Sequence, residues 1–177
     1  MLHKKVKIAL VPIKRGTMGG PLVMERKEKS IKKIEDLSKD YIELVNIDSI
    51  VNKGVVQSDN EAGPVVEFLK KEDPDGIFLI FIDFGCESAA VKIASVFKKP
   101  VLVWGERDKI DSESGIRLSN DAQCGIIAAT KVLQQGRVKF TYIVNTYLED
   151  EKFARGWDKF TRVVSVVKAM ERMKIAA

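Results

Sequence analysis

The sequence predicts an α/β protein with a doubly wound, three-layer sandwich, in which helices cover both faces of one parallel sheet. Two apolar runs carry this prediction, Gly76–Ile82 and Pro100–Trp104. Uninterrupted apolar runs of this length are typical of strands buried on both faces. Glu87–Phe97, between them, has a helical pattern. Two strands joined through a helix are parallel, so both end at the same edge of the sheet, which is where ligands bind in open α/β folds.

The first part of the chain alternates in the same way. Val6–Ile13 is a short apolar run typical of a strand. Leu22–Ser38 places its apolar residues on one face of a helix, and Tyr41–Ile47 predicts a second strand. The segment Asp48–Gln57 has no regular pattern.

The next helix is predicted from its capping residues. Ser58 and Asp59 are typical residues before a helix, which we expect to run to Lys71. Gly63 and Pro64 delay its start, because proline is accepted only in the first turn. The turn sequence Asp73–Gly76 then leads into the third strand.

The second half completes the pattern. A polar loop begins at Gly105 and reaches Gly115, and Arg117–Gln135 predicts a helix with small residues facing the sheet. Lys139–Val144 predicts the fifth strand, and Leu148–Met173 predicts a long last helix that Gly156 weakens. Five parallel strands of this kind favour the flavodoxin-like order 2-1-3-4-5.

The length of 177 residues fits one domain, which we assign to residues 1–173. The last four residues, 174–177, begin like the first strand. They are interpreted either as the start of a strand of a missing second domain or as a frayed tail.

Composition excludes several classes of protein. Apolar residues make up 45% and charged residues 31% of the chain, as in globular proteins. The net charge is +5, but Lys and Arg are mixed with Asp and Glu, so we expect no nucleic-acid partner. No apolar run is long enough to span a membrane. Two cysteines are too few for a disulfide framework, and we expect a cytoplasmic protein.

The glycine-rich segment Arg15–Pro21 follows the first strand but matches neither the dinucleotide fingerprint nor the P-loop. An acidic pair, which a response regulator needs there, is absent, and Thr17 alone makes a flavin phosphate loop a poor fit. Lys14 and Arg15 are candidates for binding an anion or a hydroxylated ligand. The alternative is an ordinary loop.

Other candidates follow the third and fourth strands. Phe84 and Trp104 are expected either to stack on a sugar ring or to pack at the sheet edge. Cys86 lacks a nearby base, because the only histidine, His3, precedes the first strand, so partial burial is the simpler interpretation. A metal site would need several convergent ligands, and the carboxylates available at this edge do not make a complete set: Asp83, Glu87, Glu106 and Asp108.

Three strings of residues resemble the N-terminal domain of the L-fucose/L-arabinose isomerase family: Phe84–Ala90, Lys99–Gly105 and Asp121–Ala129. The opening Pro12–Gly19 is also similar to that of the family, and the resemblance covers essentially the whole chain. It implies a role in a metal-dependent aldose–ketose isomerase whose metal ligands, commonly for Mn²⁺, lie downstream of this chain.

The resemblance also implies a site and partners. The first domain of the family helps to wall the sugar pocket, often that of a neighbouring subunit. Arg15, Phe84 and Cys86 would be the substrate contacts, with Trp104 as a weaker candidate, and no residue of this chain would be catalytic or bind metal. The implied partners are a monosaccharide, the downstream isomerase domains and other copies in a homo-oligomer.

Two alternatives remain open at this point. In the first alternative, the chain is a standalone module that binds a carbohydrate or another small molecule and regulates rather than catalyses. In the second alternative, it is a structural interaction domain that binds nothing at this edge.

Overall fold

The structure is a computed structural model that describes residues 5–16, 22–110, 113–115, 117–118, 120–171 and 173. Strands and helices alternate along it, as predicted. The five main strands are β1 (Val6–Ile13), β2 (Ile42–Asn46), β3 (Gly76–Phe81), β4 (Val101–Gly105) and β7 (Phe140–Tyr142). The helices are α1 (Leu22–Leu37), α2 (Ala62–Glu72), α3 (Glu87–Phe97), α4 (Ala122–Gln135) and α5 (Glu151–Glu171).

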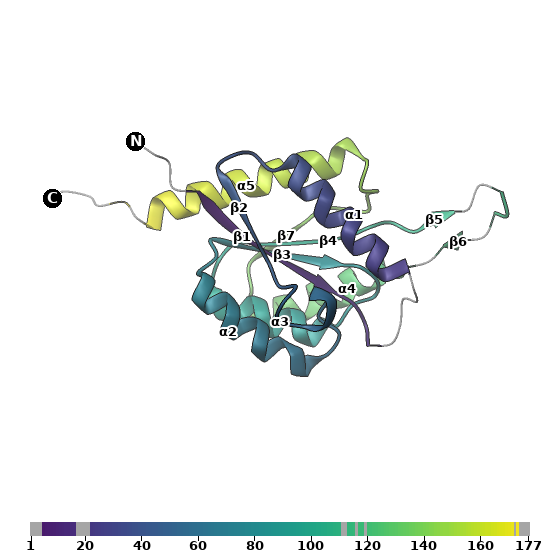
Figure 1. Ribbon diagram of the computed structural model, residues 1–177, viewed down its shortest axis with the longest axis horizontal. Coiled ribbons are helices and arrows are strands. Elements are labelled where there is room, and N and C mark those ends of the chain that lie inside the picture. Colours follow the sequence, from purple (N-terminus) through teal and green to yellow (C-terminus); the bar gives the residue numbers. More distant parts are fainter. Residues whose placement is uncertain are drawn as a thin grey trace.

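The five strands form one parallel sheet in the order β2-β1-β3-β4-β7. This confirms the predicted order, because β7 is the fifth strand of the prediction. Figure 1 shows α1 and α5 on one face of the sheet and α2, α3 and α4 on the other. The fold is therefore the doubly wound three-layer sandwich that the two apolar runs indicated.

Burial on both faces explains why the central strands could be predicted from the sequence. All six residues of β3, the middle strand, are buried. One hydrophobic cluster lies between the sheet and α2, α3 and α4, and a second lies under α1 and α5. Gly76 begins β3 where α5 crosses it. A Cβ there would lie 2.7 Å from Val164 Cγ2, so the helix can approach only a glycine.

Two predicted helix starts were wrong. The helix predicted from Arg117 begins at Ala122, because the Asn120 side-chain oxygen accepts the Ala122 N–H (2.9 Å) and fixes the start there. The last helix begins at Glu151 instead of Leu148. Asp150 Oδ2 accepts the N–H of Tyr147 (2.8 Å), which holds the preceding turn outside the helix.

The polar loop after β4 contains a short hairpin that the sequence did not predict. Strands β5 (Lys109–Ile110) and β6 (Arg117–Leu118) pair antiparallel, and Figure 1 shows them extending away from the main sheet. A short 3₁₀ turn, η1 (Asn52–Gly54), lies in the irregular segment, and a second, η2 (Asp59–Glu61), occupies the start of the helix predicted after Ser58. The expected delay at Gly63–Pro64 is present, since α2 begins at Ala62 rather than at Asp59.

Several expectations fall outside the described residues. They concern His3, the glycine-rich segment after Gly16, and the strand start or tail at residues 174–177.

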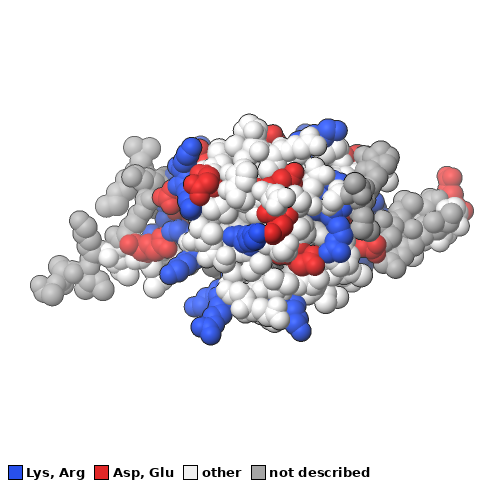
Figure 2. All heavy atoms as spheres, turned by 90° about the horizontal axis from the view of Figure 1, so that it is seen from below, with Lys and Arg blue, Asp and Glu red and all other residues white. Residues whose placement is uncertain are grey.

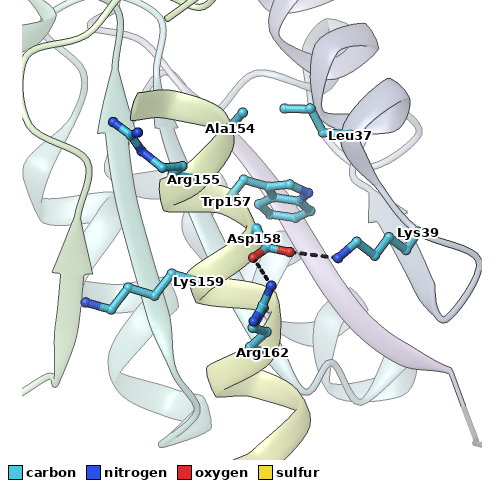
Figure 3. A pocket seen from close by; sticks show the side chains of 8 residues that line it. All are labelled: Leu37, Lys39, Ala154, Arg155, Trp157, Asp158, Lys159 and Arg162. Carbon is cyan, nitrogen blue, oxygen red and sulfur yellow. Dashed lines mark hydrogen bonds and ion pairs between the residues drawn. The ribbon is translucent and has the colours of Figure 1, made fainter. Parts of the chain in front are cut away.

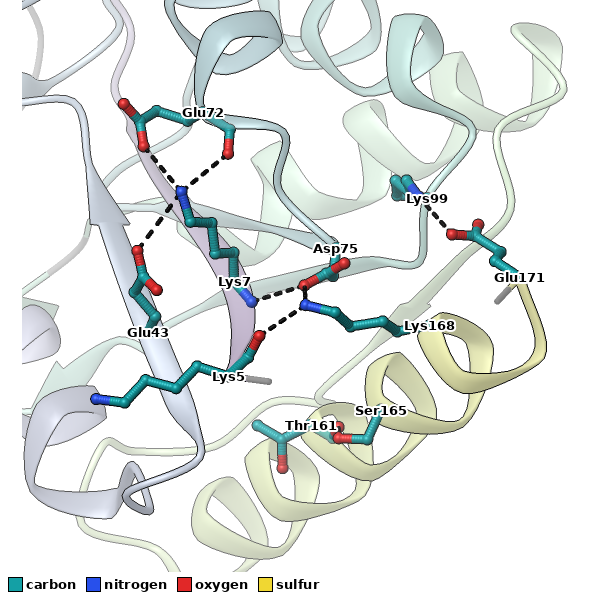
Figure 4. Close-up of polar contacts among 10 residues, drawn as sticks. All are labelled: Lys5, Lys7, Glu43, Glu72, Asp75, Lys99, Thr161, Ser165, Lys168 and Glu171. Carbon is teal, nitrogen blue, oxygen red and sulfur yellow. Dashed lines mark hydrogen bonds and ion pairs between the residues drawn. The ribbon is translucent and has the colours of Figure 1, made fainter. Parts of the chain in front are cut away.

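A network of polar contacts ties the amino ends of the strands to α5 (Figure 4). Asp75 Oδ2 accepts the backbone N–H of Lys7 (2.8 Å) and also binds the ammonium group of Lys168. Lys168 donates further to the carbonyl of Lys5 (2.6 Å). The side chains of Asp75 and Lys168 are only 11% and 12% exposed, so this pair is shielded from water.

The surface is mixed in charge. On the face seen in Figure 2, basic and acidic side chains lie among one another. Among the helices described, none has the length and apolarity needed to cross a membrane.

Candidate functional site at the carboxyl edge of the sheet

The site lies where β1 and β3 end side by side. The chain leaves β1 toward α1 on one face and leaves β3 toward α3 on the other, so the two loops part at this point. This is the switch point at which open α/β sheets bind ligands. The backbone beyond β1 is held in place, because Lys14 N–H donates to Val56 O (2.9 Å) and Gly16 N–H donates to Gln57 O (3.0 Å).

Arg15 bridges the ends of both strands. Its guanidinium carbon lies 4.0 Å from the centre of the Phe84 ring, within the range of a cation–π contact. Its Nε donates to the carbonyl of Gly85 (3.1 Å), and its Nη2 donates to Glu87 Oε2 (2.6 Å). The side chain is still 40% exposed. Three contacts therefore fix the plane of the guanidinium while part of it faces solvent.

Asp83 holds the same two strand ends together through the main chain. Its Oδ1 accepts the N–H groups of Arg15 and Gly85, both at 2.8 Å. We call these two hydrogen bonds the Asp83 clamp. The residue is 3% exposed, and its Oδ2 has no hydrogen-bond partner among the described residues. Burial raises the pKa of this carboxyl above its ordinary value of 3.8, and the two N–H donors oppose that rise.

Two glycines let the Phe84 turn form. Gly85 has a φ of +79°, and a Cβ there would meet the Phe81 ring at 2.3 Å. Gly125 lies on α4 against the turn, where a Cβ would come within 1.7 Å of the Phe84 carbonyl oxygen. The turn thus requires glycine both for its own conformation and for the close approach of α4.

Cys86 and Trp104 have different surroundings. Cys86 immediately precedes α3 and is half-buried, with its Sγ 3.4 Å from Ser88 Oγ. Trp104 is 1% exposed, packs against Phe153 and donates from Nε1 to Thr146 Oγ1 (2.9 Å). The structure thus brings Arg15, Phe84 and Cys86 to one place. It puts the Trp104 ring in the core, as in the packing interpretation.

The four candidate carboxylates divide into two groups. Asp83 and Glu87 are bound to the ends of β1 and β3, as described above. Glu106 instead accepts from Lys109 Nζ (3.0 Å), and Asp108 accepts the N–H of Asn120 (2.8 Å). Within the described ranges, no three His, Cys, Asp or Glu side chains gather where they could hold a metal ion. These residues therefore do not fit a manganese site.

A small charged pocket of about 270 Å³ beside α1 was missed by the sequence analysis. In it, the Lys29 ammonium binds Glu25 and lowers the pKa of that carboxyl. The available signal was the run of alternating charges in the first turns of the helix after β1. The pocket is lined by Leu22, Glu25, Arg26, Lys29, Glu106, Lys109 and Asn120.

No curated protein matches the chain. The family model described as fucose/sulfoquinovose isomerase, N-terminal domain, matches residues 9–171, which include every strand and helix of the main sandwich except the first residues of β1. The match confirms the resemblance proposed from the sequence, and the chain belongs to the fucose/sulfoquinovose isomerase family, of which it represents the N-terminal domain.

Proposed function

We propose that this chain forms a wall of the sugar pocket and an assembly surface in an aldose–ketose isomerase, and that it does not catalyse by itself. Its membership of the isomerase family supports this proposal. The observation that carries it is the Arg15 guanidinium, which is fixed on Phe84 and remains 40% exposed at the ligand-binding edge.

The chemistry of Arg15 suits a sugar. A guanidinium carries five N–H donors, and the contacts to Gly85 and Glu87 use only some of them. The remaining donors are available to ring hydroxyls, and their direction is set in advance because the contacts to Phe84, Gly85 and Glu87 orient the group. Fixing a donor before binding lowers the entropic cost of association. Arg15 would therefore orient the sugar, with the half-buried Phe84 ring and Cys86 beside it.

Isomerisation needs more than this edge supplies. Moving a hydrogen between adjacent carbons of a sugar requires polarised carbonyl and hydroxyl oxygens, a task suited to a bound divalent metal. We propose that the Mn²⁺ of the full-length parent is held by its downstream domains. We also propose that the parent is a homo-oligomer in the cytoplasm, in which this domain serves the pocket of a neighbouring subunit.

The test compares activity with binding. The chain alone, with Mn²⁺ and monosaccharides of the fucose and sulfoquinovose types, should show no isomerase activity, whereas addition of the downstream domains should produce it. Arg15→Ala and Phe84→Ala should then raise KM, while the exposed control Arg155→Ala should change nothing. Isomerase activity of the isolated chain would overturn the proposal.

Two other outcomes identify the alternatives. A thermal shift with monosaccharides that needs neither metal nor downstream domains would favour a standalone binding module. If neither Arg15→Ala nor Phe84→Ala alters any measured activity, the edge is structural only.

A further inference from the structure

The outer edge of β7 presents unpaired backbone groups. The strand order ends at β7, whose only partner in the described sheet is β4. The N–H of Ile143 donates to Val103 O (3.1 Å), so the backbone of Ile143 faces β4. Because successive residues of a strand point their N–H and C=O groups to opposite sides, those of Phe140 and Tyr142, the first and last residues of β7, face outward. The Tyr142 side chain is 54% exposed.

An apolar surface continues from this edge onto α5. The helix carries a stripe at helical spacing, Val163, Val166, Val167 and Met170, in which Val166 and Met170 are 57% and 62% exposed. A pocket of about 380 Å³ lies between the stripe and β7, with Phe140, Phe160 and Val163 in its lining. This volume accommodates a large apolar side chain next to the open edge.

Four cations surround the amino end of β7: Lys98, Lys99, Arg137 and Lys139. They line the apolar pocket or a neighbouring one of about 460 Å³, and Lys98, Lys99 and Lys139 line both. Lys99 pairs with Glu171 (2.7 Å), whereas no carboxylate in the described part of the chain pairs with the other three. Cations favour the carboxyl ends of helices, which accounts for Lys98 after α3 and Arg137 after α4. That effect does not account for Lys139, which lies immediately before the edge strand β7.

We propose that the β7 edge binds an extended acidic segment of another polypeptide, which adds to the sheet as a further strand. Its backbone would pair with Phe140 and Tyr142, and one apolar side chain would enter the neighbouring pocket beside Val163. Its carboxylates would lie against the cations at the amino end of β7. Charge complementarity thus selects the partner, while the backbone pairing supplies affinity.

A second copy of this chain fits the edge less well. If two β7 strands paired antiparallel about a twofold axis, the residues opposite Lys139 would be those at the carboxyl end of the other β7. Residues 142–145, at and after this end, include no acidic side chain, so the cations would stay uncompensated. Lysine next to an edge strand also discourages unspecific pairing, and this protective role is the competing explanation.

The experiment uses a short acetylated peptide in which Val alternates with Asp and Glu, titrated into the ¹⁵N-labelled chain. Amide shifts should move at Phe140 and Tyr142, and added salt should weaken the binding. Reversing two charges, Lys98→Glu with Lys139→Glu, should weaken it about tenfold, equivalent to about 1.4 kcal/mol. Tyr142→Pro should also weaken it, because it removes only an outward N–H and leaves the bonds to β4 intact.

The matched control reverses two cations that lie away from β7, on α5: Arg155→Glu with Lys159→Glu. They line a hollow of about 560 Å³ (Figure 3), where Asp158 already pairs with Lys39 (2.8 Å) and Arg162 (2.7 Å). This control should leave peptide affinity within about twofold of the parent. The proposal is overturned if β7 amides do not shift at about 1 mM peptide. Equal binding of a Val–Lys peptide, or an equal loss in the control, would overturn it as well.

Discussion

Replacing Asp83 separates the two effects of this buried carboxylate, its hydrogen bonds and its charge. Asp83→Ala removes both, and leaves the N–H groups of Arg15 and Gly85 without their acceptor. Asp83→Asn keeps an acceptor oxygen in the same position but carries no charge. Comparing the two variants therefore tests the Asp83 clamp independently of the desolvation of the carboxylate.

The size of the effect follows from the burial of each donor. A hydrogen bond to a charged group contributes about 1.5–3 kcal/mol, and the Gly85 bond is fully buried whereas the Arg15 bond is partly so. Removing a desolvated charge offsets part of this loss. We expect Asp83→Ala to lower the free energy of unfolding by about 2–3 kcal/mol at pH 7. This corresponds to a Tm lower by about 4–12 °C for a domain of this size.

The pH dependence has a definite sign. The pKa of Asp83 is raised in the folded state, so between 3.8 and that raised pKa the folded protein holds a proton that the unfolded chain has lost. The stability that this proton contributes is complete below 3.8 and is lost as the pH rises through the folded pKa. The parent should therefore gain stability relative to Asp83→Asn as the pH falls through this window.

Urea unfolding followed by the fluorescence of buried Trp104 and Trp157 measures both quantities, at a series of pH values from about 3.5 to 7. Asp36→Asn, at an exposed position on α1, is the control for a generic loss of charge. A stability difference between the parent and Asp83→Asn that does not change with pH would refute the argument from burial. An Asp83→Ala variant as stable as the control would refute the clamp.

Three further substitutions test the packing around the site. Gly125→Ala should destabilise the fold by about 1–3 kcal/mol and weaken sugar binding, because its Cβ would overlap the Phe84 carbonyl. Calorimetry measures the stability and ligand titration measures the binding, and unchanged values would contradict the close approach. Trp104→Phe should cost about 2 kcal/mol in urea unfolding, through the lost bond to Thr146 and a small cavity, and a neutral result would place the indole outside the core. Asp75→Ala should cost about 3 kcal/mol because it leaves Lys168 shielded without its partner, whereas the exposed control Glu67→Ala should cost less than about 0.5 kcal/mol.

The sequence predicted the parts of the fold that depend on continuous burial. The strands β3 and β4 are apolar throughout, and their parallel arrangement follows from the helix between them. The proximity of Arg15 to the Phe84 turn could be anticipated from the same rule, because both follow strands that end at one edge. Continuous apolar runs and the order of strands and helices along the chain are enough to predict these features.

Other features depend on contacts between segments far apart in sequence. Trp104 donates to Thr146, 42 residues away, so the sequence left open whether its ring faced a ligand or the core. The helix starts at Ala122 and Glu151 depend instead on local contacts, since Asn120 and Asp150 each accept one backbone N–H within three residues, and side-chain periodicity does not reveal such contacts. The β5–β6 hairpin is too short to show an alternating pattern.

The two hydrogen bonds that Asp83 accepts, from Arg15 and from Gly85, could not be predicted from the sequence, although the residue itself was a candidate. Its clamp reaches a backbone N–H 68 residues away, and a backbone donor has no signature in the sequence. The acidic residue could be noticed as a possible ligand, but its partners could be found only in three dimensions.

The Asp83 clamp has a consequence for how this edge can diversify. Asp83 binds main-chain N–H groups, and Gly125 admits a main-chain carbonyl, so the path of both loops is set without the side chains of Arg15 and Phe84. Those two side chains can then be exchanged while the backbone that presents them stays in place. Under the proposed function, substitutions at these two positions would alter the preference for a sugar at little cost to the stability of the domain.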